Sequence, residues 1–344
     1  AGAGEMASFS DDEYRLCGAV IFPTAAEVWA KCDMMVKVKE PLEEEYPYLR
    51  PGLILFTYLH LAPNRPLVDA LFSSGVKAVA YETIEGRMGS LPCLRPMSEI
   101  AGRLSIQEGA KYLERPFGGR GILLGGVPGV ERGKVVIVGG GIAGTYAAKA
   151  AVGMGAQVTL LDISLTRLVY LDDIFGTSIT TLYSSETNVA RSLAEADLVI
   201  GAVLIPGATT PRLIRQNHLK IMKQGAVIVD IAIDQGGCCE TSRPTTHDDP
   251  VFILDGIVHY CVGNMPGAVP RTSTVALANT TLPYGMMIAE TGLEKACEFN
   301  EGLSKGVNIY EGTCANKNVA DSLNLPYTPV HEAMSYPLSC ASTV

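Results

Sequence analysis

The sequence predicts an α/β protein with two modules in series, each built on a parallel sheet that helices cover. Its 344 residues, 47% of them hydrophobic and 18% charged, are enough for about two domains with a core each. From residue 33 onward, short apolar runs alternate with stretches long enough for a crossover helix, which is typical of βαβ units. Most of these runs are continuous rather than interrupted by polar residues, which favours strands buried on both faces. We expect the boundary between the modules near Pro92–Met97.

Eight apolar runs are expected to form strands. In chain order they are Met34–Val38, Leu53–Leu59, Val76–Tyr81, Val135–Val138, Val158–Leu161, Ile179–Leu182, Leu198–Ile200 and Ala226–Ile233. A helix is predicted over Ser98–Glu114, because Arg115-Pro116 would end it and the glycine-rich stretch Gly118–Gly126 follows as a loop. The chain end from Tyr327 carries two prolines and little periodicity, so we expect a mobile tail there.

Composition and charge argue against several classes of protein. Lys plus Arg number 27 and Asp plus Glu 36, so the net charge is −9, whereas a nucleic-acid binder normally has a basic face. The nine cysteines are scattered without a C-x-x-C pair, which favours free thiols in a reducing cytosol. No apolar run approaches the ~18 residues of a membrane helix, and no signal-peptide pattern is present. The chain opens at Ala1 without an initiator Met, so either the N-terminus was processed or part of the chain is missing.

A glycine-rich turn is the sharpest local motif. Gly139, Gly141 and Gly144 have the spacing G-x-G-x-x-G, an apolar strand leads into the turn, and the helix-forming stretch Ala143–Met154 leaves it. In a dinucleotide-binding fold the first glycine allows the tight turn, and the second lets the backbone approach the pyrophosphate. The third permits close packing of the helix, whose N-terminus offers N–H groups to the phosphates. The motif predicts a dinucleotide site, and the alternative is a purely structural glycine turn.

An acidic residue follows the next predicted strand, where a dinucleotide-binding fold needs one. Asp162 lies 18 residues after Gly144 (162 − 144) and would accept hydrogen bonds from the adenosine ribose hydroxyls. Its charge would repel a 2′-phosphate, which favours NAD over NADP, although the nearby Arg167 argues the other way.

Four ionisable residues directly follow predicted strands, the place where open α/β sheets bind ligands. They are Lys39, His60, Glu82 and Asp234. His60 is the natural general acid or base, since an imidazole titrates near neutrality. Lys39 could polarise a carbonyl or hold a carboxylate, and Asp234 could orient a water molecule or His60. Glu82 is expected behind them or as a partner for Lys39, and each of the four could instead be a satisfied structural residue.

Several Cys and His residues lie close together in the second half of the chain: Cys238, Cys239, His247, His259 and Cys261. No pair has the ligand spacing of a recognised zinc site, so no metal is expected. The polar stretch Ser242–Pro250 is either a functional loop or a surface connector.

Nine ordered stretches resemble one known family. They are Val36–Pro41, Leu53–Leu61, Ala80–Thr83, Pro96–Arg103, Gly121–Val130, Gly139–Gly144, Asp230–Cys238, Ser242–Pro250 and His259–Thr274. With them the chain resembles the alanine dehydrogenases, which share their fold with the NAD(H)-binding part of proton-translocating transhydrogenase. The similarity runs from about Phe9 to Val330.

The resemblance implies two Rossmann-like domains and NAD-dependent oxidative deamination of L-alanine to pyruvate and ammonia. A substrate domain would comprise residues 1–92 and 271–344, and an NAD-binding domain residues 93–270. His60 resembles the general acid/base of the family and Asp234 its partner in handling water and the imine, while Lys39 would contact substrate oxygen beside Glu82 and Met97. The implied cofactor contacts are Ser98, Ile142, Ala143, Asp162, Arg167, Ser184, Val203, Leu204, Ile231, Asp234, Val262, Gly263, Asn264 and Met265. A cytoplasmic homohexamer is also implied.

The resemblance has one departure. Family members begin with a further strand and helix that include an Arg for the substrate carboxylate, and the sequence as given is expected to lack that segment. Two alternatives therefore stay open. One is an NAD(H)-binding transhydrogenase subunit, against which the loops at Asp234 and Ser242–Pro250 argue, and the other is a non-catalytic NAD-binding homologue.

Overall fold

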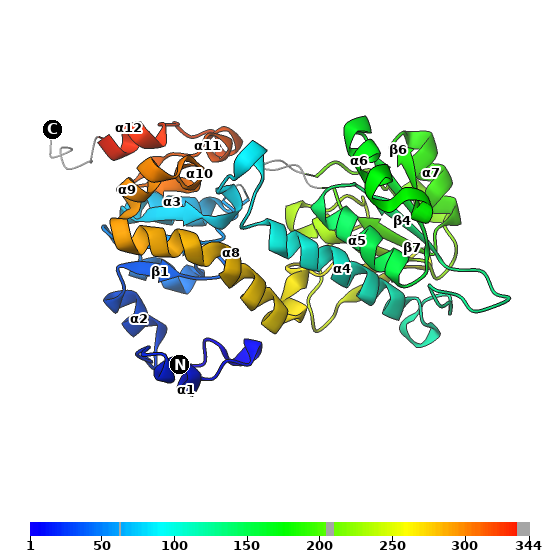
Figure 1. The fold of residues 1–344 in the computed structure, drawn as a ribbon, viewed down its shortest axis with the longest axis horizontal. Helices are drawn as coiled ribbons and strands as arrows, with labels where there is room; N and C mark the ends of the chain where they lie inside the picture. Colours follow the sequence, from blue (N-terminus) through cyan, green and yellow to red (C-terminus); the bar gives the residue numbers. More distant parts are fainter. Residues whose placement is uncertain (62, 204–209, 336–344) are drawn as a thin grey trace. The chain divides into compact units, whose positions relative to one another are not determined.

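The computed structural model describes residues 1–61, 63–203 and 210–335, drawn in Figure 1. The chain forms two compact units by its contacts. Unit 1 comprises Ala1–Pro96 with Pro270–Val344, and unit 2 comprises Met97–Val269. None of the helices in the described ranges is long and apolar enough to cross a membrane.

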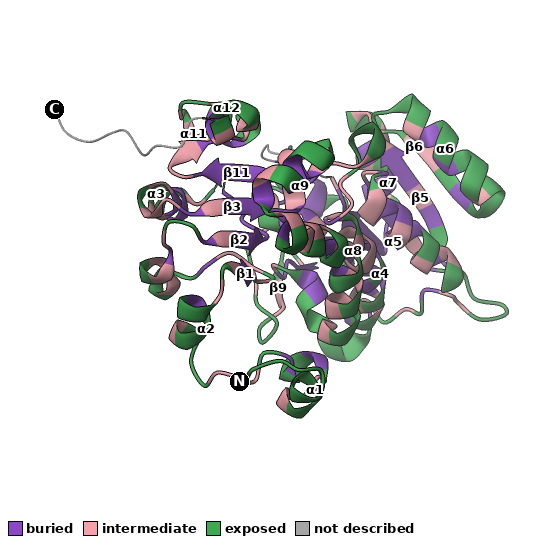
Figure 2. Cartoon of the chain, turned by 60° about the vertical axis from the view of Figure 1, so that its left-hand side comes forward, coloured by how far each residue is buried: buried purple, intermediate pink, exposed green. Residues whose placement is uncertain are grey.

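Unit 1 is built on a five-stranded mixed sheet with the order β1-β2-β3-β11-β12. Its strands are β1 (Met34–Val36), β2 (Ile54–Thr57), β3 (Lys77–Ala80), β11 (Val307–Tyr310) and β12 (Thr313–Cys314). β1, β2 and β3 pair in parallel, whereas β11 is antiparallel to both β3 and β12. Figure 2 shows these strands largely buried between helices whose outer sides are exposed.

The helices of unit 1 come from both ends of the chain. They are α1 (Asp11–Leu16), α2 (Ala25–Lys31), α3 (Arg65–Ser74), α8 (Pro270–Thr291), α9 (Leu293–Phe299), α10 (Glu301–Ser304), α11 (Lys317–Leu323) and α12 (Val330–Ser335), with the short 3-10 turns η1 (Glu5–Ala7), η2 (Glu43–Tyr48), η3 (Tyr81–Thr83) and η4 (Arg87–Gly89). α3 begins where the Asn64 side chain accepts the N–H of Leu67 and ends at Gly75, whose φ of 67° suits glycine. Leu67 of α3 lies fully buried in one core with Leu55 and Ile309, which joins both chain ends into one unit.

Unit 2 contains a seven-stranded sheet with the order β6-β5-β4-β7-β8-β10-β9. Its strands are β4 (Lys134–Val138), β5 (Gln157–Asp162), β6 (Ile179–Tyr183), β7 (Leu198–Gly201), β8 (Val227–Asp230), β9 (Val251–Leu254) and β10 (Ile257–Tyr260). Its helices are α4 (Arg95–Tyr112), α5 (Ile142–Gly153), α6 (Leu165–Phe175) and α7 (Glu186–Glu195). Its 3-10 turns are η5 (Arg115–Phe117), η6 (Gly176–Ser178), η7 (Gln216–Lys220), η8 (Ile231–Gln235) and η9 (Met265–Ala268). All neighbouring strands run parallel except β9, which is antiparallel to β10. The order reverses at β4, as in a Rossmann fold.

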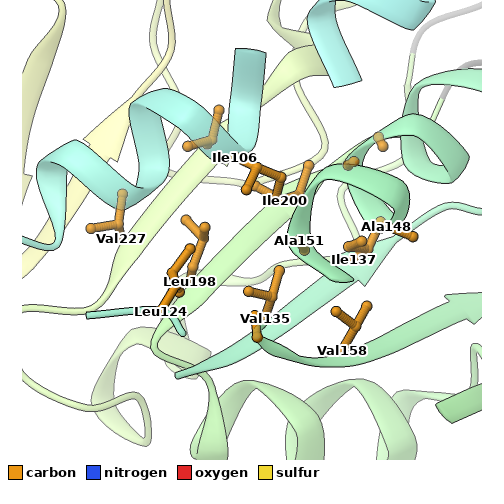
Figure 3. Packing of buried hydrophobic residues seen from close by; sticks show 14 of the residues in the cluster. Ile106, Leu124, Val135, Ile137, Ala148, Ala151, Val158, Leu198, Ile200 and Val227 are labelled. Carbon is orange, nitrogen blue, oxygen red and sulfur yellow. The ribbon is translucent and has the colours of Figure 1, made fainter. Parts of the chain in front are cut away.

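The core of unit 2 lies between its sheet and the helices α4 and α5. Figure 3 shows Val135 of β4 and Leu198 of β7 close to Ile106 of α4 and Ala151 of α5, and all four are buried. Strand side chains on both faces are apolar, because helices cover both.

The predicted α/β class is confirmed, with corrections in detail. The sheets are mixed rather than purely parallel: β9 and β10 form an unpredicted hairpin, although Asp255-Gly256 between them is a typical hairpin turn. The strand predicted over Ala226–Ile233 ends at Asp230, because the Asp230 carboxylate accepts the N–H of Ala232 and begins η8. The expected tail from Tyr327 was wrong as far as residue 335, since α12 forms there and buries Ala333.

Candidate functional site

Three of the predicted site residues follow neighbouring strands of unit 1. Lys39 comes after β1, His60 after β2 and Glu82 in η3 directly after β3. Because these strands are parallel neighbours, their carboxyl ends share one edge of the sheet. The three side chains are therefore brought to the edge where open sheets bind ligands.

The backbone of His60 is held in an unusual conformation by Glu82. His60 has a φ of 47°, a left-handed value that residues other than glycine seldom adopt. The Glu82 carboxylate accepts the N–H of His60 at 2.8 Å and that of Leu59 at 3.1 Å. The His60 ring stacks on Tyr58, with ring centroids 5.8 Å apart. Glu82 thus contacts the backbone that presents His60 instead of pairing with Lys39.

Glu40, which the sequence reasoning missed, makes the side-chain contact to His60. Its Oε2 lies 3.2 Å from His60 Nδ1 and 3.9 Å from Lys39 Nζ. Burial alone would raise the pKa of Glu40, but the hydrogen bond with His60, a backbone N–H and the charge of Lys39 together lower it to about 2. Glu40 is therefore ionised near neutral pH. The stability from these contacts is complete above the ordinary carboxyl pKa of 4.5 and is lost as the pH falls towards 2.

Lys39 is anchored through its backbone, while its side chain is partly free. Its carbonyl accepts the Thr57 hydroxyl of β2 at 2.9 Å, which fixes the loop after β1 to the neighbouring strand. The side chain is 41% exposed, and among the described residues its ammonium pairs with Glu40, whose Oε2 lies 3.9 Å away. Such an ammonium group is available to a carbonyl or carboxylate oxygen.

The glycine turn of unit 2 has the geometry expected of a phosphate-binding turn. Gly139 has a φ of 105°, and a Cβ on Gly144 would lie 1.8 Å from the Gly139 carbonyl oxygen. Gly141 caps α5, and a Cβ there would meet no atom within 4 Å. The first turn of α5 contains Ile142 and Ala143, whose N–H groups have no partner within the helix. The turn therefore has open space beside Gly141, next to the N-terminal N–H groups of α5.

Asp162 and Arg167 both contact this turn. The Asp162 carboxylate accepts the N–H of Gly140 at 2.7 Å and that of Ser164 at 2.8 Å. The Arg167 guanidinium donates to the Gly140 carbonyl and, at 2.6 Å, to the Thr145 hydroxyl. Both side chains therefore lie beside the turn, with opposite charges.

The other predicted cofactor contacts of unit 2 mostly follow its parallel strands. Ser184 follows β6, Val203 follows β7, Ile231 and Asp234 are in η8 after β8, and Val262, Gly263, Asn264 and Met265 follow β10. Asp234 accepts the N–H of Asn264, 3.1 Å from each carboxylate oxygen, which joins two of these segments. Met97 and Ser98 are half-buried at the start of α4, and Leu204 lies outside the described residues.

The residues present at this edge fit a dinucleotide. Besides the open cradle at Gly141, the buried hydroxyl oxygen of Ser184 has no hydrogen-bond partner among the described residues. A buried hydroxyl normally has a partner, so a ligand group that bonds it would be favoured. The helix N-terminus suits the pyrophosphate and Asp162 the ribose hydroxyls.

Asp230 is a second residue that the sequence reasoning missed. It lies at the end of β8 and is 2% exposed. Its carboxylate accepts the Ser242 hydroxyl at 2.7 Å, and the N–H groups of Ala232, Cys238 and Cys239 at 3.2, 3.0 and 3.1 Å. These bonds hold the segment that carries Asp234.

Burial disfavours the charged forms of three thiols and of the His259 imidazole near this segment. Burial raises the pKa of the Cys238, Cys239 and Cys261 thiols. Burial also lowers the pKa of His259, which donates from Nδ1 to the Ile257 carbonyl and accepts the Thr241 hydroxyl at Nε2. Among the residues that the structure describes, no group of three or more His, Cys, Asp or Glu side chains could hold a metal ion.

Replacing Gly144 with alanine should weaken NADH binding more than tenfold. The added Cβ would lie 1.8 Å from the Gly139 carbonyl oxygen, so either the turn or the start of α5 must shift. Gly153→Ala, at the other end of α5, is the matched control because a Cβ there meets nothing within 4 Å. Fluorescence titration with NADH measures both variants, and equal affinities would contradict this account of the turn.

Comparison with known proteins gives consistent matches over the chain. Residues 1–101 match the family model "Alanine dehydrogenase/PNT, N-terminal domain", and residues 105–317 match "Alanine dehydrogenase/PNT, C-terminal domain". Alanine dehydrogenase 2 of Staphylococcus aureus strain USA300 is 54% identical over 333 residues, which are 96% of this chain and 89% of that protein. The alanine dehydrogenase of Methanococcus maripaludis is 54% identical over 97% of this chain and 90% of its own length.

Solved structures match as well. A structure titled L-alanine dehydrogenase has a TM-score of 0.89 and 51% identity, with 94% of this chain and 89% of that chain covered. A transhydrogenase from Sinorhizobium meliloti has a TM-score of 0.78 but only 22% identity, over 92% of this chain and 89% of its own, which shows a shared fold and no more.

Proposed function

The chain belongs to the alanine dehydrogenase/PNT family, and we propose that it catalyses the NAD-dependent, reversible oxidative deamination of L-alanine to pyruvate and ammonia. The observation that carries this proposal is the 54% identity to alanine dehydrogenases over 96% of the chain. The likeness to a transhydrogenase, at 22% identity, supports the fold alone.

The residues of unit 1 supply groups for proton transfer and substrate binding. In the oxidation, the Cα–H bond of alanine breaks and an N–H proton is lost, which leaves an imine. NAD, when bound, would supply the acceptor for this hydrogen and its electron pair. Water then adds to the imine carbon and ammonia leaves. We assign to His60 the proton taken from that water and returned to the departing nitrogen. Lys39 would bind the substrate oxygen, since its ammonium is partly exposed and lies 3.9 Å from Glu40.

Asp234 and the glycine turn complete the proposed roles. Asp234 would assist in handling water and the imine, and its anchoring by the Asn264 N–H supports a fixed orientation. Met97 and Glu82 are proposed near the substrate, with Glu82 acting through the His60 backbone. The residue set that follows the strands of unit 2, Leu204 included, is proposed to bind NAD. We further propose residues 1–92 and 271–344 as the substrate domain, residues 93–270 as the NAD-binding domain, and a cytoplasmic homohexamer.

The decisive experiment follows NADH formation by absorbance with L-alanine and NAD. Controls replace NAD with NADP, and L-alanine with other amino acids. NADH formation that depends on alanine supports the proposal. NADH binding without turnover would instead favour a non-catalytic homologue, and hydride exchange between two nicotinamide nucleotides without alanine would favour the transhydrogenase alternative. Light scattering tests the hexamer separately.

Replacing Asp162 with asparagine should shift cofactor preference towards NADP. Asparagine can still accept one of the two backbone N–H groups, but it removes the charge that repels a 2′-phosphate and leaves Arg167 beside the turn. A charged hydrogen bond contributes ~1.5–3 kcal/mol, so the NAD-to-NADP ratio of kcat/KM should fall about tenfold or more. Steady-state kinetics with both nucleotides measures this ratio. An unchanged ratio would show that Asp162 does not determine the choice between NAD and NADP.

A further inference from the structure

Three residues of unit 1 hold His60, one through its backbone and two through its ring. Its backbone N–H is bound by Glu82, its ring face lies on Tyr58, and its Nδ1 lies 3.2 Å from Glu40. Tyr58 is itself held, because its hydroxyl donates to the Cys93 carbonyl at 2.6 Å. Among the described residues, Nε2 of His60 has no hydrogen-bond partner. One ring nitrogen is therefore engaged and the other is available.

The partner at Nδ1 decides which nitrogen carries the proton of the neutral ring. An ionised carboxylate can only accept a hydrogen bond, so Nδ1 must be the N–H donor. Glu40 is half-buried and ionised near neutral pH, which the depressed pKa of its carboxyl supports. The neutral ring then has its lone pair at Nε2.

We infer that Glu40 is a positioning residue, which holds His60 in the Nδ1–H tautomer and makes Nε2 the atom that exchanges protons with the substrate. The inference rests on the proposed role of His60 as the acid/base of alanine oxidation. Glu40 touches no reacting atom in this account and acts through the imidazole, as the carboxylate of a catalytic triad does.

The charged groups around His60 leave Glu40 as the acid that contacts its ring. Lys39 lies 3.9 Å from the same carboxylate oxygen of Glu40, and the Glu82 carboxylate is directed at backbone N–H groups. Among the described residues, the Nδ1 contact of His60 is therefore made by Glu40.

The tautomer can be measured without any turnover. The imidazole nitrogens of ¹⁵N-labelled protein are recorded by NMR near neutral pH, and His60 is identified among the five histidines by the His60→Asn variant. We expect the wild-type signals to be those of a ring protonated at Nδ1. In Glu40→Ala the signals should shift towards the Nε2–H form that free histidine prefers. A wild-type His60 protonated at Nε2 would overturn the inference, whether or not the protein oxidises alanine.

Kinetics of two Glu40 variants provide the second arm. We expect Glu40→Ala to lower kcat with alanine on the order of 100-fold, while the Kd for NADH stays within twofold. Glu40→Gln should recover most of this loss, because its amide oxygen can still accept the Nδ1–H of His60. Glu44→Gln, an exposed acid four residues away, is the matched control and should change neither quantity. Unchanged kcat in Glu40→Ala, or no recovery in Glu40→Gln, would also overturn the inference. Lack of alanine oxidation by the wild type would contradict the proposed function but leave the NMR arm decisive.

Discussion

His60→Asn should lower kcat for alanine oxidation by at least 100-fold while NADH binding stays nearly unchanged. Positioned general acid–base groups contribute ~10²–10⁴-fold to a rate, and His60 is the imidazole that lies just beyond a parallel strand in the described part of unit 1. Asparagine is the sharper substitution, because it tolerates the left-handed φ of 47° at this position better than alanine does. The loss can then be assigned to the missing acid/base rather than to a strained loop.

The control for this prediction is another exposed histidine. His331→Ala removes an imidazole on α12 whose side chain is 77% exposed, and its kcat should match the wild type's. His60→Ala should behave like His60→Asn, with an added loss of thermal stability from strain. Stopped-flow measurement of the first turnover separates the chemical step from product release. Turnover by His60→Asn within threefold of the wild type would show that another group handles the proton.

The glycine turn could be predicted because its signal is local. The motif of Gly139, Gly141 and Gly144 is recognised from the strand before it and the helix after it, and both lie in the same stretch of about twenty residues. The confirmed α/β class follows from the alternation of apolar runs with helical stretches along the chain. The antiparallel strands are harder to predict from the sequence. β11 pairs with β3, which lies more than 200 positions earlier, and a run of four residues has too little periodicity to indicate its partner strand.

Glu40 and Asp230 escaped the sequence reasoning for different physical reasons. Glu40 adjoins Lys39 in a loop, and sequence order does not tell which of the two side chains meets His60 from the neighbouring strand. Asp230 interrupts an apolar run whose pattern predicts one strand through Ile233. A carboxylate in such a run is too costly to bury without partners, so it was itself the signal that the strand ends there.

Asp230→Ala is expected to cost unit 2 roughly 3–5 kcal/mol of stability, the range for removing one partner from a buried charged network. The carboxylate is 2% exposed and accepts three backbone N–H groups and the Ser242 hydroxyl. Alanine would leave these donors buried without an acceptor, and each unsatisfied donor costs ~1–3 kcal/mol. The measured result should be a clear fall in the unfolding temperature of this unit by calorimetry.

The same substitution should loosen the segment that carries Asp234, since the bonds to Asp230 are what close it. Hydrogen exchange of the amides of residues 231–242 should therefore accelerate far more than that of β4 or β5, and kcat should fall even where the protein remains folded. Asp248→Ala, in the exposed loop after Ser242, is the control and should alter neither. Faster exchange spread evenly over unit 2 would mean that Asp230 stabilises the unit as a whole. Faster exchange confined to 231–242 would mean that the buried Asp230 carboxylate holds in place the segment that carries Asp234.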